Sequence, residues 1–270
     1  ILIGLVGSEM CIRDRFNTAM TGYPESLTDP SYAGQLMTLT YPLVGNYGVP
    51  PFTLEPNGLA TFMESERIHA EAIIVSDYSE EYSHWNAKES LADWLKREQV
   101  PGITGIDTRE LTKVLREHGV MMGKIVFDDE PGNVPEATYA GINYVDKVSC
   151  KEVIRYNEGA GKKKVVLVDC GVKTNIIRCL LKRDVEVIRV PWNHDFTGME
   201  YDGLFISNGP GDPDTCDEAV QHIPKAMSLS DKPIFGICMG NQLLSKAGGA
   251  TIYKLKLSLI HISEPTRPIS

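Results

Sequence analysis

The sequence predicts an α/β protein, with a doubly wound, mostly parallel sheet in its C-terminal part and an α+β domain before it. Apolar runs in the second half, such as KVVLVDCG and KPIFGICMG, alternate with helix-like segments such as KTNIIRCLLKRD. Buried strands that alternate with helices are typical of a parallel sheet covered on both faces. The first half shows no strict alternation, which favours α+β there.

Local patterns predict the elements of the first half. Strands are expected over residues 35–42, 72–75 and 120–127, which are rich in apolar and β-branched side chains. The segment 91–98 has helical spacing of its apolar side chains. The segment GIDTRELTKVLREHG predicts a second helix, whose first turn Asp107 can cap.

The second half divides more clearly into strands and helices. Strands are expected in KVVLVDCG, VEVIRVP, YDGLFISNGPGDP and KPIFGICMG, and helices in KTNIIRCLLKRD, EAVQHIPKAMSL and NQLLSKAGGA. Pro224 lies inside the second of these helices, where a proline removes a backbone donor. We therefore expect that helix to end or kink at Pro224.

Composition changes suggest the domain boundaries. Residues 16–150 are interpreted as the N-terminal domain and 164–256 as the C-terminal domain. The polar segment 151–163 contains two glycines near its end and is interpreted as a linker. Residues 1–15 and 257–270 resemble translated adapter sequence and are interpreted as artefactual tails, the alternative being genuine disordered termini.

Overall composition excludes several classes of function. The formal net charge is −9, and the longest cationic cluster is Lys162-Lys163-Lys164, which argues against nucleic acid as the main partner. No apolar run reaches the roughly 18 residues that a membrane helix needs. The six cysteines are scattered without a C-x-x-C pair, so a zinc site or a disulfide framework is not expected. Scattered thiols fit a reducing cytoplasm, and we expect cytoplasmic localisation and no metal.

The stretch FGICMGNQLL contains the candidate nucleophile, Cys238. This cysteine falls between a strand expected over 233–237 and a helix that begins near Met239. A sharp strand-to-helix turn requires small flanking residues, which Gly236 and Gly240 supply. The helix N-terminus favours a thiolate, and the Met239 N–H could stabilise an oxyanion.

A structural alternative exists for each of these residues. A free cysteine is often a small buried hydrophobe, and for an isolated cysteine that interpretation is preferred. The Gly-x-Cys-x-Gly context at a strand end reverses the preference for Cys238. The other cysteines outside the leading tail are interpreted as structural: Cys150, Cys170, Cys179 and Cys216.

Two sets of motifs carry a family resemblance. PIFGICMGNQLL, with FISNGPGDP before it, resembles a class I glutamine amidotransferase domain. FNTAMTGYPESLTDPSY and GIDTRELTKVLREHG resemble the N-terminal domain of the small, glutamine-hydrolysing subunit of carbamoyl-phosphate synthetase. The resemblance runs from about Phe16 to Lys256. Two independent motif sets in the same order make it specific.

The resemblance implies a role for each matching residue. Cys238 would attack the γ-carbonyl of L-glutamine and form a thioester. Gly209 and Gly211 would line the glutamine site, where a Gly-Pro-Gly loop lets backbone amides approach a ligand. Met239 would give an oxyanion N–H, Gln242 would contact substrate, and Ser31 would reach in from the N-terminal domain. The structural alternatives are a tight turn for the loop, a surface side chain for Gln242 and a turn hydroxyl for Ser31.

The sequence departs from the family pattern in two places. Asn241 stands where many members have histidine, which we expect to be tolerated. The family's catalytic His and Glu lie beyond the YKLK segment, and no histidine here has a good claim to be the base. We therefore expect this chain, as it stands, to hydrolyse glutamine slowly or not at all.

The resemblance also implies partners and a pathway. Ammonia would pass to a large synthetase subunit that uses ATP and bicarbonate to make carbamoyl phosphate for arginine and pyrimidine synthesis. No Walker A sequence is present, so no cofactor is expected in this chain. Two other functions stay open: another hydrolase with a cysteine nucleophile, and a scaffold subunit whose thiol is idle.

Overall fold

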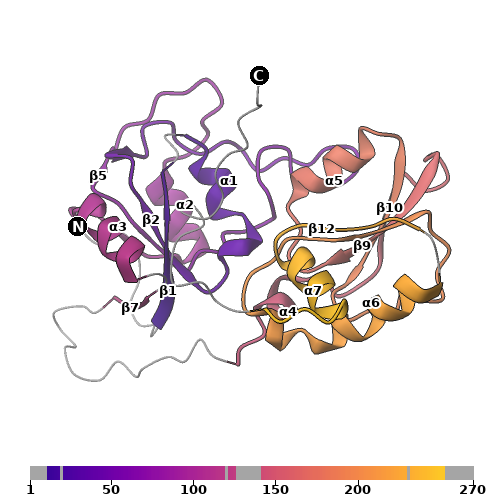
Figure 1. The fold of residues 1–270 in the computed structure, drawn as a ribbon. Coiled ribbons are helices and arrows are strands. Elements are labelled where there is room, and N and C mark those ends of the chain that lie inside the picture. Colours follow the sequence, from indigo (N-terminus) through magenta and orange to yellow (C-terminus); the bar gives the residue numbers. More distant parts are fainter. Residues whose placement is uncertain (1–10, 19–20, 119–120, 126–140, 230–231, 253–270) are drawn as a thin grey trace, which may run out of the picture.

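The computed structural model describes residues 11–18, 21–118, 121–125, 141–229 and 232–252, and for 11–16 it describes the backbone only. These residues form two α/β units side by side, each around its own sheet (Figure 1). The N-terminal unit holds α2 and α3, and the C-terminal unit holds α5, α6 and α7. The functional site lies at an edge of the second sheet.

The first sheet has five strands in the order β6-β4-β2-β1-β7. Its strands are β1 (Cys11–Asn17), β2 (Gln35–Leu39), β4 (Ala72–Ile74), β6 (Gly102–Ile103) and β7 (Met122–Lys124). All neighbours are parallel except β7, which pairs antiparallel with β1. This sheet is more regular than the α+β expectation implied, because no helix lies between β2 and β4 and the sequence therefore shows no alternation of strands with helices there.

Helices and short elements surround the first sheet. They are α1 (Tyr23–Leu27), the 3₁₀ turn η1 (Pro30–Tyr32), α2 (Leu91–Glu98), α3 (Thr108–His118), and a small pair formed by β3 (Leu43–Val44) and β5 (Asp77–Tyr78). The capping predicted for Asp107 is confirmed, since its Oδ1 accepts from the N–H groups of Arg109 and Glu110 at 3.1 and 3.0 Å. A cap of this kind contributes about 1 kcal/mol to helix stability.

The second sheet has the order β12-β11-β9-β10-β8. Its strands are β8 (Ile154–Tyr156), β9 (Lys163–Asp169), β10 (Val185–Pro191), β11 (Gly203–Ile206) and β12 (Ile234–Gly236). Four of them are parallel, and β8 pairs antiparallel with β10 at the edge. The predicted mostly parallel sheet is confirmed.

Helices cover both faces of this sheet, as the doubly wound prediction requires. They are α4 (Tyr144–Val148), α5 (Thr174–Leu181), α6 (Asp217–Leu229) and α7 (Met239–Ala247), with a 3₁₀ turn η2 (Pro213–Thr215). Along β9 the side chains alternate: Val166 and Val168 pack with α6 and α7, whereas Leu167 packs with α5. Period-two alternation with apolar residues on both sides is the pattern of a fully buried strand.

Three sequence expectations need comment. Strand β1 begins at Cys11, inside the segment interpreted as a tail over 1–15. Strand β8 lies inside the expected linker 151–163 and belongs to the second sheet. Pro224 does not end α6, which continues to Leu229.

The two units contact each other through the segment 53–64 of the first and α5 of the second. Arg178 contributes several of these hydrogen bonds: its Nε donates to Glu55 Oε1 at 2.9 Å. Its Nη2 also donates to the backbone carbonyl oxygens of Ala60, Thr61 and Met63. A guanidinium fork that is satisfied in this way fixes both position and orientation.

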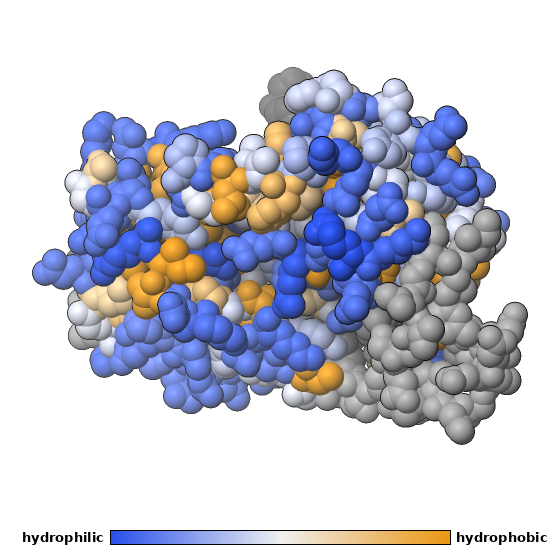
Figure 2. All heavy atoms as spheres, turned by 180° about the vertical axis from the view of Figure 1, so that it is seen from behind, coloured by the Kyte–Doolittle hydropathy of each residue, from blue (hydrophilic) through white to orange (hydrophobic). Residues whose placement is uncertain are grey.

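The outer surface is mostly polar. Figure 2 shows the face opposite to that of Figure 1 as largely hydrophilic, with small, separate hydrophobic patches. Within the described ranges, no helix combines the length and apolar character that a bilayer span requires.

Candidate active site

Cys238 occupies a strained turn between β12 and α7. Its backbone has φ 51° and ψ −109°, and it is the N-cap residue of α7. Within the described ranges, three other non-glycine residues have positive φ, among them Gln99 at φ 59° and ψ 33°, an ordinary left-handed helical conformation. The ψ of Cys238 lies far outside that region, so its backbone stores strain of about 1–3 kcal/mol. Strain at an exposed cysteine is typical of a nucleophile elbow.

The flanking glycines are required by close backbone packing. A Cβ on Gly240 would lie 2.1 Å from the carbonyl oxygen of Ile206 and 2.9 Å from that of Ser207. A Cβ on Gly236 would lie 2.5 Å from the carbonyl carbon of Gly240. Two hydrogen bonds hold this arrangement, from Ile237 N–H to Ile206 O and from Gly240 N–H to Ser207 O, both 3.0 Å. The steric reason predicted for both glycines is therefore present.

The Gly-Pro-Gly loop leaves the sheet directly beside the elbow. Strands β11 and β12 are parallel, with Ile206 opposite Gly236. Continuing this register by two residues places Asn208 opposite Cys238, at the carboxyl edge where ligands bind in open α/β sheets.

Both glycines of this loop are also constrained. A Cβ on Gly209 would lie 2.0 Å from the carbonyl oxygen of Cys170. Gly211 has φ +90°, and a Cβ there would lie 3.3 Å from Tyr144 Cβ. No larger residue fits at Gly209 without moving backbone, and Gly211 has a conformation that L residues rarely adopt.

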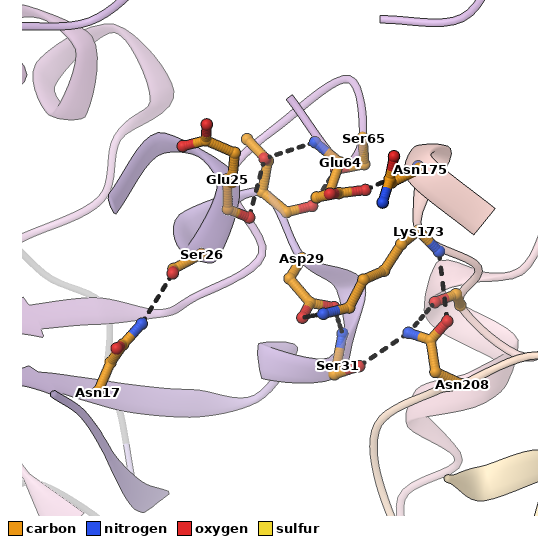
Figure 3. A network of polar contacts seen from close by, with 12 residues as sticks. Asn17, Glu25, Ser26, Asp29, Ser31, Glu64, Ser65, Lys173, Asn175 and Asn208 are labelled. Atoms are coloured by element: carbon orange, nitrogen blue, oxygen red, sulfur yellow. Dashed lines mark hydrogen bonds and ion pairs between the residues drawn. The ribbon is translucent and has the colours of Figure 1, made fainter. Parts of the chain in front are cut away.

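Ser31 reaches this edge from the N-terminal unit, as Figure 3 shows. Its hydroxyl accepts a hydrogen bond from Asn208 Nδ2 at 2.9 Å. The same Nδ2 donates to Gly171 O at 2.9 Å, and Asn208 Oδ1 accepts from Lys173 N–H at 3.3 Å. Asn208 is buried, and its amide thus ties three chain segments together at the start of the Gly-Pro-Gly loop.

Asp29 and Lys173 add a charged contact between the units. Asp29 Oδ1 accepts from Ser31 N–H at 2.9 Å, and its Oδ2 lies 2.6 Å from Lys173 Nζ. Burial disfavours the charged form of Lys173, but Asp29 outweighs this and raises the pKa of the lysine. Glu64 reinforces the contact, because its backbone oxygen accepts from Thr174 N–H and its carboxylate from Asn175 N–H, both at 2.9 Å.

Asn208, Asp29 and Lys173 are site residues that the sequence did not predict. Asn208 and Asp29 stand inside the two motifs quoted there, SNGPGDP and TDPSY, next to residues that were chosen. Lys173 follows the looser motif VDCGVKTN. Their proximity depends on the contact between the two units, and no local pattern reports that contact.

The first turn of α7 supplies the remaining predicted residues. Met239 has a buried side chain, and among the described residues its N–H has no hydrogen-bond acceptor. Gln242 is exposed, and its backbone N–H donates to Cys238 O at 3.1 Å. The structure therefore places Cys238, Met239 and Gln242 on one turn.

The other thiols differ from Cys238 in their surroundings. Cys170 and Cys216 are buried, and burial raises the pKa of Cys216 to about 11. Burial, with the neighbouring charge of Asp169, raises the pKa of Cys150 to about 12. Cys179 is exposed on α5, where it provides an internal comparison for the reactivity of Cys238.

No histidine in the described part of the chain is hydrogen-bonded to Cys238. His222 lies on α6, with its Nδ1 3.6 Å from Asp195 Oδ1. His69, His84 and His118 belong to the first unit. The described residues also contain no group of three His, Cys, Asp or Glu side chains that could hold a metal ion.

Two families match this chain, one on each unit. The family described as "Carbamoyl-phosphate synthase small chain, CPSase domain" matches residues 7–125, and "Glutamine amidotransferase class-I" matches residues 166–265. The chain thus carries a carbamoyl-phosphate synthase small-chain domain followed by a class-I glutamine amidotransferase domain. Both matches extend past the tail boundaries expected at Phe16 and Lys256.

Relatives of the small-chain and amidotransferase domains occur in much longer proteins. The chain is 45% identical to the multifunctional protein pyr1-3 of Dictyostelium discoideum, over 96% of this chain and 12% of that protein. It is 46% identical to human mitochondrial carbamoyl-phosphate synthase [ammonia], over 90% of this chain and 16% of that protein. It is 43% identical to the multifunctional protein URA2 of Saccharomyces cerevisiae, over 89% of this chain and 12% of that protein. The chain therefore spans less than a fifth of the length of these relatives.

Proposed function

We propose that this chain is the glutamine-hydrolysing part of a carbamoyl-phosphate synthase. The observation that carries the proposal is the exposed, strained Cys238 at the end of β12, beside the Gly-Pro-Gly loop of the amidotransferase domain. A cysteine held at the N-terminus of a helix with φ 51° and ψ −109° is costly, and nucleophilic chemistry gives a reason for that cost.

The reaction uses the residues of this edge. The Cys238 sulfur adds to the γ-carbonyl carbon of L-glutamine, and the negative charge that forms on the carbonyl oxygen is stabilised by the Met239 N–H. The C–N bond then breaks, ammonia leaves, and a thioester remains that water hydrolyses to glutamate. Gly209, Gly211 and Gln242 line the substrate site, and Ser31 contributes from the small-chain domain.

The reaction also needs a base for the thiol and an acceptor for the ammonia. A histidine base, oriented by a glutamate, would take the thiol proton, and none of the described histidines is placed to do so. We propose that this chain alone binds glutamine but turns it over slowly. Ammonia would pass to a synthetase polypeptide that uses ATP and bicarbonate, in the cytoplasm, for pyrimidine and arginine synthesis. The chain itself would need no cofactor.

The name of the human relative specifies ammonia, which supports a second candidate: a chain that keeps the fold without hydrolysing glutamine. The strained cysteine favours the first candidate, because an idle thiol gives no reason to retain strain at this position. A general cysteine hydrolase, the third possibility, is disfavoured by the matched small-chain domain.

Protection of Cys238 from alkylation tests the proposal. The rate at which iodoacetamide modifies Cys238 should fall in a saturable way with L-glutamine, because bound glutamine covers the sulfur. D-glutamine and L-asparagine are matched controls, and exposed Cys179 is the internal reference. Equal modification of Cys238 with and without L-glutamine would contradict the proposal.

A further inference from the structure

A groove separate from Cys238 lies on the small-chain domain, outside the carboxyl ends of β1 and β2. Its volume is about 530 Å³, and it is widely open to solvent. The residues that line it come from these two strand ends and from α3: Thr18, Thr40, Tyr41, Pro42, Leu43, Arg109, Thr112, Lys113 and Arg116. In open α/β sheets with parallel strands, ligands bind at this edge. The volume falls within the range of roughly 300–1,000 Å³ that is usual for small-molecule sites.

The charge of the groove is opposite to that of the chain. Arg109, Lys113 and Arg116 line it, and no Asp or Glu of the described residues does, although the chain has a formal net charge of −9. Lys113 also contacts Glu110 on the neighbouring side of α3. The ion pairs among the described residues include neither Arg109 nor Arg116, so both guanidinium groups are available to a ligand.

The cationic side chains share one face of α3. Arg109, Lys113 and Arg116 are spaced i, i+4 and i+7, which places them in a row along the helix. The opposite flank of α3 packs on the sheet, where Leu115 is buried and Leu111 is half-buried. Packing therefore fixes the rotation of the helix, and with it the direction of the cationic row. At 1.5 Å per residue the row spans about 10 Å, enough for two anionic groups of one ligand.

Among the described residues, some hydroxyl groups of the groove already donate hydrogen bonds within the protein, and others are free to donate to a ligand. Thr40 Oγ1 donates to Asn17 O at 3.1 Å, and Thr112 Oγ1 donates to Thr108 O at 2.7 Å. Their protons are committed, and these hydrogen bonds hold the wall of the groove in place. The remaining donors are the cationic groups with Thr18 and Tyr41, a set rich in donors and suited to phosphate oxygens.

We propose that this groove binds a small molecule that carries phosphate groups. The guanidinium groups of Arg109 and Arg116 bind its phosphates in a bidentate manner, and Lys113 adds a point charge between them. Tyr41 and Leu43 provide an apolar contact for the rest of the ligand. The site is independent of glutamine hydrolysis, because none of its residues belongs to the edge that holds Cys238.

Calorimetric titration of the full chain with inorganic pyrophosphate at fixed ionic strength tests the proposal. One equivalent should bind, and Arg109→Gln with Arg116→Gln should weaken binding at least tenfold. The double variant Lys96→Gln with Lys182→Gln removes the same charge at exposed positions outside the groove and should bind like the parent chain. Unchanged circular dichroism and thermal midpoints would show that both variants are folded.

Three outcomes would overturn the proposal. The first is an absence of pyrophosphate binding to the parent chain. The second is equal weakening in both double variants, which would indicate only a general charge effect. The third is groove-dependent binding of hexaglutamate without binding of pyrophosphate, which would assign the groove to an acidic protein segment instead.

Discussion

Replacing Gly240 by alanine should disrupt the elbow more than its single added methyl group suggests. The new Cβ would lie 2.1 Å from Ile206 O and 2.6 Å from Ile206 C, both backbone atoms of β11. To reach even 3.0 Å, α7 or β11 must move by about 0.9 Å, and a backbone cannot move as a side-chain rotamer can.

The magnitude follows from the contacts that this movement breaks. The hydrogen bonds Ile237 N–H to Ile206 O and Gly240 N–H to Ser207 O are both 3.0 Å long, and each contributes about 1 kcal/mol. Overpacking adds about 1–3 kcal/mol. We expect Gly240→Ala to lower the free energy of unfolding by about 4 kcal/mol, close to a thousandfold in the folding equilibrium constant, at about 1.4 kcal/mol per tenfold.

Urea denaturation followed by fluorescence measures this loss. Gly198→Ala is the matched control, because no heavy atom lies within 4 Å of its added Cβ, and we expect a change below about 0.5 kcal/mol there. A Gly240→Ala variant as stable as Gly198→Ala would refute the close packing of α7 on β11, and with it the geometry deduced for Cys238.

Three further predictions concern backbone strain, pH and the contact between domains. Cys238→Gly should raise the free energy of unfolding by about 1 kcal/mol, because glycine accepts the positive φ. Cys238→Ala keeps the strained backbone and should change the free energy of unfolding little. Equal stabilities of the two variants would contradict the strain at Cys238. Burial, together with Arg67, lowers the pKa of His69 from 6.5 to about 4, so the unfolded state binds the proton more readily and stability should fall as the pH drops from about 6.5 to 4, by at most about 3 kcal/mol. His69→Gln should remove that part of the pH dependence of stability. An unchanged slope of stability against pH would contradict the role assigned to His69. Arg178→Lys should lower the free energy of unfolding, measured by urea denaturation, by about 2 kcal/mol, because the guanidinium fork is lost. The control Arg97→Lys, in an exposed ion pair, should lower it by less than about 0.5 kcal/mol. Equal losses would contradict a stabilising role of Arg178 between the domains.

Local sequence patterns predicted the elements that have a clear cap or a continuous apolar run. The helix predicted over 91–98 has these bounds, because Ser90 caps it by accepting from Asp93 N–H and Leu91, Trp94 and Leu95 bury one face. The strands β9 and β10 were predicted as apolar runs because both their faces are covered. The parallel pairing of the first sheet was not predicted, since its strands do not alternate regularly with helices along the sequence.

The site was predictable to a similar extent. The position and surroundings of Cys238 followed from the glycines on either side, because their steric requirement is local. The hydrogen bond between Asn208 and Ser31 joins residues 177 positions apart, and it exists only because the units built on the two sheets pack against each other. Resemblance suggested Ser31, but no spacing in the sequence reveals Asn208 as its partner.

The most direct test of the central claim is covalent trapping. A γ-diazoketone analogue of L-glutamine should attach to the chain in one equivalent, and peptide mapping should find it on Cys238 and not on Cys179, which is also exposed. Labelling of both thiols at equal rates, or of neither, would contradict a glutamine site at the turn between β12 and α7.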